Sequence, residues 1–326
     1  MHHIYRRDWL LTPEGTPRGY IQPQFLREVW FHTGTICNLS CSFCLEGSRP
    51  GDNRIEMLTF KDAKPFIHEA LSMGVEQFCF TGGEPFVIRD IFQILDYALT
   101  YRPCLVLTNG TKPLQLRMQQ LLPLKKKPHT LRLRISLDYP DEELHDVGRG
   151  KGNYRRALDS LVQLYQMGFA VSVARRMAAG ENSMEVEKRY RKLFVSLGLP
   201  EDIHIVAFPE YNPPGSPASV PAITEQCMIR YKDASSRAAF MCNNIKMVLK
   251  QDGVMKVYAC TLVDDDPDYC MGSSLTEAMR YRVMLKHHRC YACFSTGASC
   301  CEPALEGNHQ NGKPNMRENY ETAKRS

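Results

Sequence analysis

The stretch GTICNLSCSFCLEGS, residues 34–48, places Cys37, Cys41 and Cys44 in the spacing C-x3-C-x2-C. A structural zinc site is closed by four ligands, and a cubane iron–sulfur cluster normally takes four cysteine thiolates. Three cysteines in one short loop therefore leave one coordination position of a bound metal centre open. Because an open position can bind a reacting molecule, the stretch predicts a reactive metal centre and a fold that carries it on a loop.

The composition is that of a globular protein with a substantial core. The chain has 326 residues, of which 43% are hydrophobic and 24% charged, and its formal net charge is +5. This charge is mild for the size and does not indicate a nucleic-acid or membrane surface. No apolar run approaches the roughly 18 residues that span a bilayer, and the N-terminus has no signal-peptide pattern, so we expect a cytoplasmic protein. In that reducing compartment the 13 cysteines argue for metal ligation more than for disulfides.

Short β-rich runs alternate with amphipathic stretches between residue 29 and about residue 210, which is typical of βα units. The expected strands cover residues 29–35, 76–81, 104–108, 131–137, 169–174 and 203–208. The expected helices cover residues 60–74, 88–101, 115–122, 153–168 and 183–198. This order predicts an α/β protein whose parallel sheet forms a partial (β/α)6 TIM-like barrel. In such barrels the reactive residues lie at the C-terminal strand ends and in the loops that follow.

A proline-rich stretch, YNPPGSPASVPA at residues 211–222, breaks this pattern and predicts a boundary after the barrel. Beyond it, residues 245–260 predict a β-hairpin that turns at Asp252-Gly253, and residues 275–285 predict a short helix. The expected division of the chain is a lead-in at 1–28, the barrel at 29–210, a linker at 211–240, a small cysteine-rich domain at 241–302 and a disordered tail at 303–326.

Three further motifs end successive expected strands: TGGEPF at residues 81–86, TNG at residues 108–110 and ISLD at residues 135–138. A zinc-knuckle fragment would explain the cysteine loop alone, but not the four ordered motifs. Together they resemble the radical S-adenosylmethionine superfamily. The resemblance implies a [4Fe-4S] cluster on the three cysteines, whose fourth iron binds the amino and carboxylate groups of S-adenosylmethionine. In that family the reduced cluster cleaves this cofactor, and the resulting 5′-deoxyadenosyl radical abstracts a hydrogen atom from the substrate.

The resemblance also assigns roles to the residues nearest the cofactor. Phe43, just before the last cysteine of the loop, is expected to pack near the adenine, a role compatible with that of an aromatic anchor for the loop. The GGEP segment is expected to meet the methionine amino group through Gly82, Gly83 and Glu84, because glycines allow a close approach of the backbone.

Polar residues at the later strand ends are expected to hold the rest of the cofactor. By resemblance, Thr108 and Ser136 are placed to bond its carboxylate or ribose, and Asp138 either contacts the ribose or caps the following turn. Arg149 lies in HDVGRGKGNY, which resembles a segment of members with a C-terminal cluster domain, so it is expected to hold the carboxylate. Arg175 is a comparable candidate, and an ordinary salt bridge is the alternative for both arginines.

A second cysteine set lies in the C-terminal part of the chain. Cys242 and Cys260 flank the expected hairpin as C-x17-C, and Cys290 and Cys293 form C-x2-C. This arrangement resembles the twitch domain, the shorter relative of the SPASM domain, which implies one auxiliary [4Fe-4S] cluster on four cysteines. A zinc ribbon is the alternative, since two cysteine pairs also suit zinc.

The remaining C-terminal cysteines are Cys227, Cys270, Cys300 and Cys301. SPASM proteins continue past C-x2-C with further cysteines, and Cys300 partly imitates this pattern. No residue after Cys301 supplies the last ligand, so a second auxiliary cluster is not favoured.

These features predict a radical S-adenosylmethionine oxidoreductase that receives electrons from a donor such as flavodoxin or ferredoxin. Only 36 residues precede Cys37, which leaves no room for a separate peptide-binding domain, so we expect a two-electron oxidation of a small molecule such as a sugar, aminocyclitol or nucleoside. The alternatives are a peptide delivered by a partner, a redox-neutral rearrangement or epimerisation, and, among non-enzymes, a zinc-binding protein or electron carrier. RNA is disfavoured because no basic stripe is interleaved with aromatic residues. The sequence identifies no catalytic base.

Overall fold

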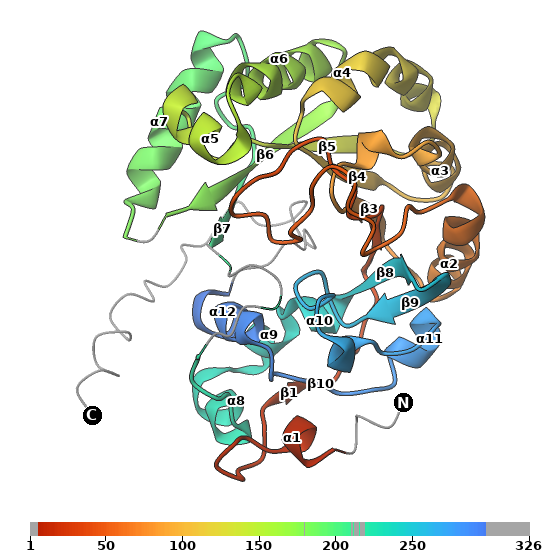
Figure 1. Cartoon of the computed structure of the whole chain (residues 1–326), viewed down its shortest axis with the longest axis vertical. Helices are drawn as coiled ribbons and strands as arrows, with labels where there is room; N and C mark the ends of the chain where they lie inside the picture. The colour runs from red at the N-terminus through yellow and green to blue at the C-terminus, as the bar shows by residue number, and fades with distance from the viewer. Residues whose placement is uncertain (1–5, 179, 210, 212–214, 216–218, 298–326) are drawn as a thin grey trace.

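The structure, a computed structural model, describes residues 6–178, 180–209, 211, 215 and 219–297, and its centre is one curved sheet (Figure 1). Its eight strands follow the order β7-β6-β5-β4-β3-β2-β8-β9. The strands are β2 Glu28–His32, β3 Gln77–Thr81, β4 Cys104–Thr108, β5 Leu131–Ser136, β6 Ala170–Met177, β7 Ile205–Pro209, β8 Ile245–Gln251 and β9 Val254–Tyr258. All neighbours from β7 to β8 are parallel, which confirms the expected partial barrel.

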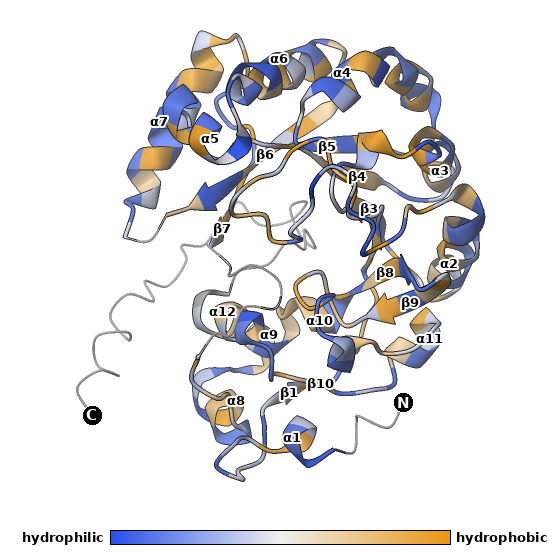
Figure 2. Ribbon diagram, in the orientation of Figure 1, coloured by the Kyte–Doolittle hydropathy of each residue, from blue (hydrophilic) through white to orange (hydrophobic). Residues whose placement is uncertain are grey.

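Helices cover the outer side of this sheet (Figure 1). They are α2 Phe60–Ser72, α3 Ile91–Ala98, α4 Lys112–Arg117, α5 Glu142–Arg149, α6 Asn153–Gln166 and α7 Ser183–Ser196, with short 3-10 turns η2 Pro85–Val87 and η3 Met118–Lys126. In α6 the spacing of Ala157, Leu161 and Leu164 puts all three on one buried face. Figure 2 shows the result, with apolar and polar residues side by side along α6 and α7.

The helix expected at residues 115–122 is wrong in its form. The chain is α-helical only to Arg117 and continues as a 3-10 helix to Lys126. Pro123 lies inside that segment, and a proline disfavours the α conformation of the residue before it. Helix α5, which the sequence analysis did not include, begins where the Asp141 carboxylate accepts a hydrogen bond from the Leu144 N–H.

The expected C-terminal hairpin is confirmed, and it belongs to the same sheet as the barrel. Strand β9 pairs antiparallel with β8, while β8 pairs in parallel with β2, the first barrel strand. The turn at Asp252-Gly253 has φ values of 54° and 74°, which suit a tight two-residue hairpin. The hairpin therefore brings the second cysteine set beside the start of the barrel.

The helix expected at residues 275–285 is only partly right. Helix α11 covers Leu275–Ala278, and β10, Val283–Met284, then pairs antiparallel with β1, Tyr20–Ile21. A pairing so distant in the chain cannot be read from a local pattern, which explains the difference. The other short elements are α1 Arg7–Leu10, α8 Glu225–Tyr231, α9 Ala234–Ala238, α10 Met241–Asn244, η4 Pro267–Tyr269 and α12 His288–Thr296.

Part of the expected organisation lies outside the described residues: the tail at 303–326, Cys300 and Cys301. Within the described ranges, no helix is long and apolar enough to cross a membrane.

Candidate functional site

A cavity of about 450 Å³ lies at the C-terminal ends of the sheet strands. Thr81, Ser136 and Pro209, the last residues of β3, β5 and β7, form part of its wall. Cys44 lines the same cavity, and so does Thr261, which follows Cys260. The cavity therefore lies between the two cysteine sets, at the end of the barrel where the sequence analysis placed the reactive residues.

The loop of Cys37, Cys41 and Cys44 follows β2. Cys37 is buried, the other two are partly buried, and all are free thiols. Burial raises the pKa of all three, that of Cys37 to about 12, although the Leu39 N–H bonded to its sulfur at 3.4 Å and the Arg149 charge near Cys41 act in the opposite direction. Thiols of this kind become thiolates when a metal centre binds them.

The GGE segment after β3 packs directly on the backbone of the cysteine loop. The Gly83 N–H donates to the Gly34 carbonyl at 2.8 Å, and the Glu84 N–H donates to the Ile36 carbonyl at 3.1 Å. A Cβ atom at Gly83 would lie 2.2 Å from the Ile36 oxygen, and one at Gly82 would lie 2.8 Å from the Gly34 oxygen. The missing side chains thus make room for the cysteine loop; the expected contact of this segment with a methionine amino group stays a prediction.

Glu84 connects two of the sequence motifs. Its fully buried carboxylate accepts hydrogen bonds from the Thr108 hydroxyl at 2.8 Å, the Asn109 N–H at 2.8 Å and the Phe86 N–H at 3.1 Å. Burial raises the pKa of Glu84 to about 7, while the Asn109 and Thr108 hydrogen bonds act to lower it. The side chain of Thr108 is therefore engaged by Glu84.

Asn38 and Asn109 join this network, and the sequence analysis did not single them out. The Asn109 side-chain amide donates to the Asn38 side-chain oxygen at 3.0 Å and lies 3.8 Å from the Cys37 sulfur. The Asn38 amide in turn donates to the Thr111 hydroxyl at 2.9 Å. Asn109 is the middle residue of the TNG motif, so the motif itself could have identified it.

Asp138 and Arg149, both expected near the cofactor, bind each other. The Arg149 guanidinium donates to the two Asp138 carboxylate oxygens at 2.6 and 3.1 Å, a bidentate geometry. The Phe43 ring lies beside this pair, with the guanidinium carbons of Arg149 and Arg176 at 5.4 and 4.2 Å from its centroid. The salt-bridge alternative for Arg149 is therefore present, while its contact with a cofactor carboxylate stays a prediction.

Arg175 lines the cavity, and two of its buried donor atoms have no partner among the described residues. Its side chain is fully buried, and its Nη1 pairs with the Glu181 carboxylate. The two donor atoms without a partner are Nε and Nη2. Because a buried cationic donor without a partner is costly, these atoms suit an anionic group of a bound molecule.

The four cysteines expected to bind an auxiliary cluster come together. Cys242 lies on α10, Cys260 follows β9, and Cys290 and Cys293 lie on α12, all lining one small cavity of about 20 Å³. Burial raises the pKa of the thiols of Cys242 to about 12 and of Cys290 to about 11, and burial together with the other three thiols raises that of Cys260. The set can thus hold one cationic centre.

Among the described residues, these thiols do not form the tight group of ligand atoms that a closed tetrahedral zinc site has. Tetrahedral zinc, with bonds of about 2.3 Å, would hold the sulfurs about 3.8 Å apart, whereas a cubane cluster gives each sulfur its own iron. In the described part of the chain, one group of three or more potential ligand atoms lies within 4.8 Å of one another, and it contains no cysteine.

The other two described C-terminal cysteines do not line the small cavity. Cys227 accepts a hydrogen bond from the Thr224 hydroxyl at 3.2 Å, and the thiol of Cys270 lies 3.9 Å from the Gly272 carbonyl oxygen. Their assignment to a further cluster gains no support from these positions.

Comparisons of the sequence find one family model and several partial relatives. The model of the Radical SAM superfamily matches residues 31–193, half of the chain. The antilisterial bacteriocin subtilosin biosynthesis protein AlbA of Bacillus subtilis is 34% identical over 151 residues, 45% of this chain and 32% of that protein. A probable GTP 3′,8-cyclase of Aeropyrum pernix is 27% identical over 266 residues, 76% of this chain and 68% of that protein. The chain spans about a third of the length of the first curated relatives it matches.

Solved structures resemble the fold. The crystal structure of Streptococcus suis SuiB bound to its precursor peptide SuiA matches with a TM-score of 0.56 and 14% identity, covering 79% of this chain and 65% of that one. A structure of anSMEcpe with bound AdoMet matches with a TM-score of 0.57 and 14% identity, covering 82% and 79%. At this identity the likeness shows a shared fold.

Proposed function

This chain belongs to the radical SAM superfamily, and we propose that it oxidises a substrate by two electrons in the cavity between its two cysteine sets. When a [4Fe-4S] cluster on Cys37, Cys41 and Cys44 is reduced with S-adenosylmethionine bound, it supplies the 5′-deoxyadenosyl radical that removes a hydrogen atom from the substrate. Cys242, Cys260, Cys290 and Cys293 would hold a second [4Fe-4S] cluster, which would accept the electron that the substrate radical gives up as it releases a proton. A flavodoxin or ferredoxin provides the reducing electron.

The proposal rests on the position of the cavity. Its wall includes Phe43 and Cys44 of the first loop, together with Met241 and Thr261, the direct neighbours of two C-terminal cysteines. A molecule bound there contacts both cysteine-bearing segments. A redox-neutral rearrangement needs no final electron acceptor, so a second metal site beside the cavity supports oxidation.

The residues of the cavity wall orient the bound molecules and keep water away. Trp30, Leu107 and Phe208 give the wall an apolar part, which lowers the local dielectric. The free donors of Arg175 hold an anionic group, and the stack of Arg176 on Phe43 keeps the loop aromatic in place.

The substrate we propose is a small molecule such as a sugar, aminocyclitol or nucleoside, since the concave cavity must hold it together with S-adenosylmethionine. A peptide delivered by a partner is the second candidate. It is supported by the relatives, among which one acts in bacteriocin biosynthesis and one solved structure holds a precursor peptide.

Metal analysis tests the two-cluster proposal. Anaerobic reconstitution should give about eight irons per chain, four for each cluster. Zinc bound to the C-terminal cysteines, with about four irons in total, would contradict the auxiliary cluster.

Mass spectrometry of the reaction with the true substrate should show a product two hydrogens lighter and one 5′-deoxyadenosine for each product. A product isomeric with the substrate would contradict the oxidation.

Gly83→Ala should prevent the first cluster from forming. The new Cβ would lie 2.2 Å from the Ile36 carbonyl, one residue before Cys37, so the cysteine loop would have to move. We expect the loss of about half of the iron and of S-adenosylmethionine binding, measured by iron analysis and equilibrium binding. Gly74→Ala is the control for backbone strain without a clash: an added Cβ there meets no atom within 4 Å, but the φ of 80° is unfavourable for alanine. Full iron in folded Gly83→Ala would show that the loop tolerates the side chain.

Arg175→Met should weaken the binding of S-adenosylmethionine about tenfold or more, since a charge-assisted hydrogen bond to its carboxylate is lost. The iron content should stay at the wild-type level, because this side chain contacts neither cysteine set. Arg156→Met, on the outer helix α6, is the control. Unchanged affinity for S-adenosylmethionine would assign Arg175 to the substrate or to the Glu181 ion pair alone.

A further inference from the structure

A buried polar junction joins the first cysteine loop to the segments that carry the C-terminal cysteines. Its members on the loop side are Leu45 and Glu46, directly after Cys44, and its members on the C-terminal side are Asp264 and Arg289. Neither the family motifs nor the expected ligands include these four residues.

Arg289 forms the first link of the junction. It precedes Cys290 and is 1% exposed. Its Nη2 donates to the Leu45 carbonyl at 3.2 Å, while its Nη1 donates to the Leu262 carbonyl at 3.1 Å and lies 3.4 Å from the Asp265 carboxylate. One rigid guanidinium thus ties the residue after Cys44 to two C-terminal segments.

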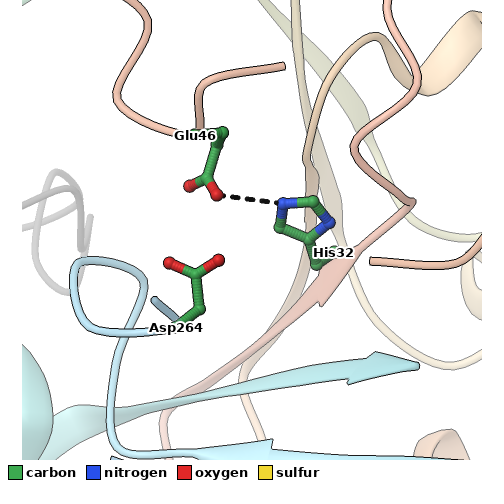
Figure 3. Close-up of side chains that lie close together, drawn as sticks. All are labelled: His32, Glu46 and Asp264. Carbon is green, nitrogen blue, oxygen red and sulfur yellow. Dashed lines mark hydrogen bonds and ion pairs between the residues drawn. The ribbon is translucent and has the colours of Figure 1, made fainter. Parts of the chain in front are cut away.

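His32, Glu46 and Asp264 form the second link, and Figure 3 shows their side chains pointing toward one another. The His32 Nε2 lies 3.2 Å from a Glu46 carboxylate oxygen, and the ligand atoms of all three residues lie within 4.8 Å of one another. The Arg54 guanidinium lies 3.8 Å from the Glu46 carboxylate and 4.0 Å from that of Asp264. The three residues come from β2, the cysteine loop and the segment after Cys260.

The hydrogen bonding of His32 argues against a metal ion at this second link. The Gly34 N–H donates to His32 Nδ1 at 3.1 Å, so Nδ1 accepts and the ring proton of the neutral imidazole lies on Nε2. Nε2 then donates to Glu46, whereas a histidine that binds metal donates through its other nitrogen. Arg54 already supplies a positive charge beside the two carboxylates. The cluster joins the segments through the His32–Glu46 hydrogen bond and through the Arg54 guanidinium, which lies near both carboxylates.

We propose that Arg289 and Asp264 are positioning residues, which hold the Cys37–Cys44 loop in the geometry that binds S-adenosylmethionine. The inference rests on the proposed function only in taking this loop as the cofactor site. Gly83 and Asn109 hold the loop through hydrogen bonds to Gly34 and Asn38. The junction connects the same loop to the segments that carry the C-terminal cysteines. A change next to Cys290 therefore acts on the first cluster as well as on the C-terminal set.

The test uses the full reconstituted chain with Arg289→Lys, which keeps the charge and removes the fork of donors, and with Asp264→Leu, which removes the polar group next to Glu46 and roughly keeps the volume. We expect the iron of the first loop to be retained, the affinity for S-adenosylmethionine to fall about tenfold, and the change of the first cluster's electron paramagnetic resonance signal on adding S-adenosylmethionine to be reduced. Arg102→Lys is the matched control, since Arg102 also donates to backbone carbonyls, those of Val75 and Tyr101.

Each outcome decides the proposal. The proposal is overturned if both variants keep the wild-type affinity for S-adenosylmethionine and the wild-type resonance response. This holds even if C-terminal iron is lost, because Arg289 and Asp264 would then stabilise only the C-terminal segments. The same loss of affinity in Arg102→Lys also overturns it, since the effect is then a general one. If the wild-type C-terminal cysteines hold zinc, the proposed auxiliary cluster fails, but the measurements on the first cluster still decide the role of the junction.

Discussion

Replacing Cys37, Cys41 and Cys44 together by Ala should abolish the cleavage of S-adenosylmethionine and remove about half of the bound iron. The three thiols share one loop beside the cavity, and the GGE and TNG segments pack around them. Without them nothing on this loop can ligate a cluster, so no electron reaches the cofactor. The measurements are iron analysis after anaerobic reconstitution and chromatography of 5′-deoxyadenosine.

Cys227→Ala is the matched control for this triple variant. Its thiol is partly buried and lines neither the large cavity nor the small one, so its loss should change neither iron nor cofactor cleavage. The prediction is wrong if the triple variant still forms 5′-deoxyadenosine, because the cofactor would then be cleaved at another centre.

The double change Cys290→Ala with Cys293→Ala should separate cofactor cleavage from product formation. Both residues lie one turn apart on α12, so the variant removes two of the four thiols around the small cavity. We expect S-adenosylmethionine to be cleaved still, because the first loop is intact, while little oxidised product forms since the substrate radical has no acceptor. Mass spectrometry of 5′-deoxyadenosine and product, with the true substrate, gives the ratio.

One result of this experiment would contradict the oxidoreductase proposal: a normal yield of oxidised product would make the C-terminal site structural. Loss of cofactor cleavage as well would mean that the double change also disturbs the first loop, through Arg289 next to Cys290. Arg289→Lys, which keeps all four thiols, distinguishes such an indirect effect from the loss of the cluster itself.

The sequence predicted the sheet and the family from local patterns. Short β-rich runs followed by amphipathic stretches mark βα units, because the buried positions of a strand or a helix recur at a fixed spacing within that element. The cysteine spacing and the GGEP, TNG and ISLD segments each lie within a few residues of a strand end, so the barrel architecture placed them around one cavity. The helix expected at 115–122 continues as a 3-10 helix from Met118, because Pro123 has no N–H to donate to the carbonyl four residues before it.

Only the tertiary structure decided which partners the polar side chains have. The sequence offered Arg149 and Asp138 separately to the cofactor, and the fold pairs them with each other. It offered Gly83 as a position of close backbone approach, and the fold places the backbone of the cysteine loop against it. The contact of Arg289 with the Leu45 carbonyl spans 244 positions of the chain. Such contacts depend on how β8 pairs with β2 and closes the molecule, and no local pattern of hydrophobicity or spacing encodes the partner of a hydrogen bond across that distance.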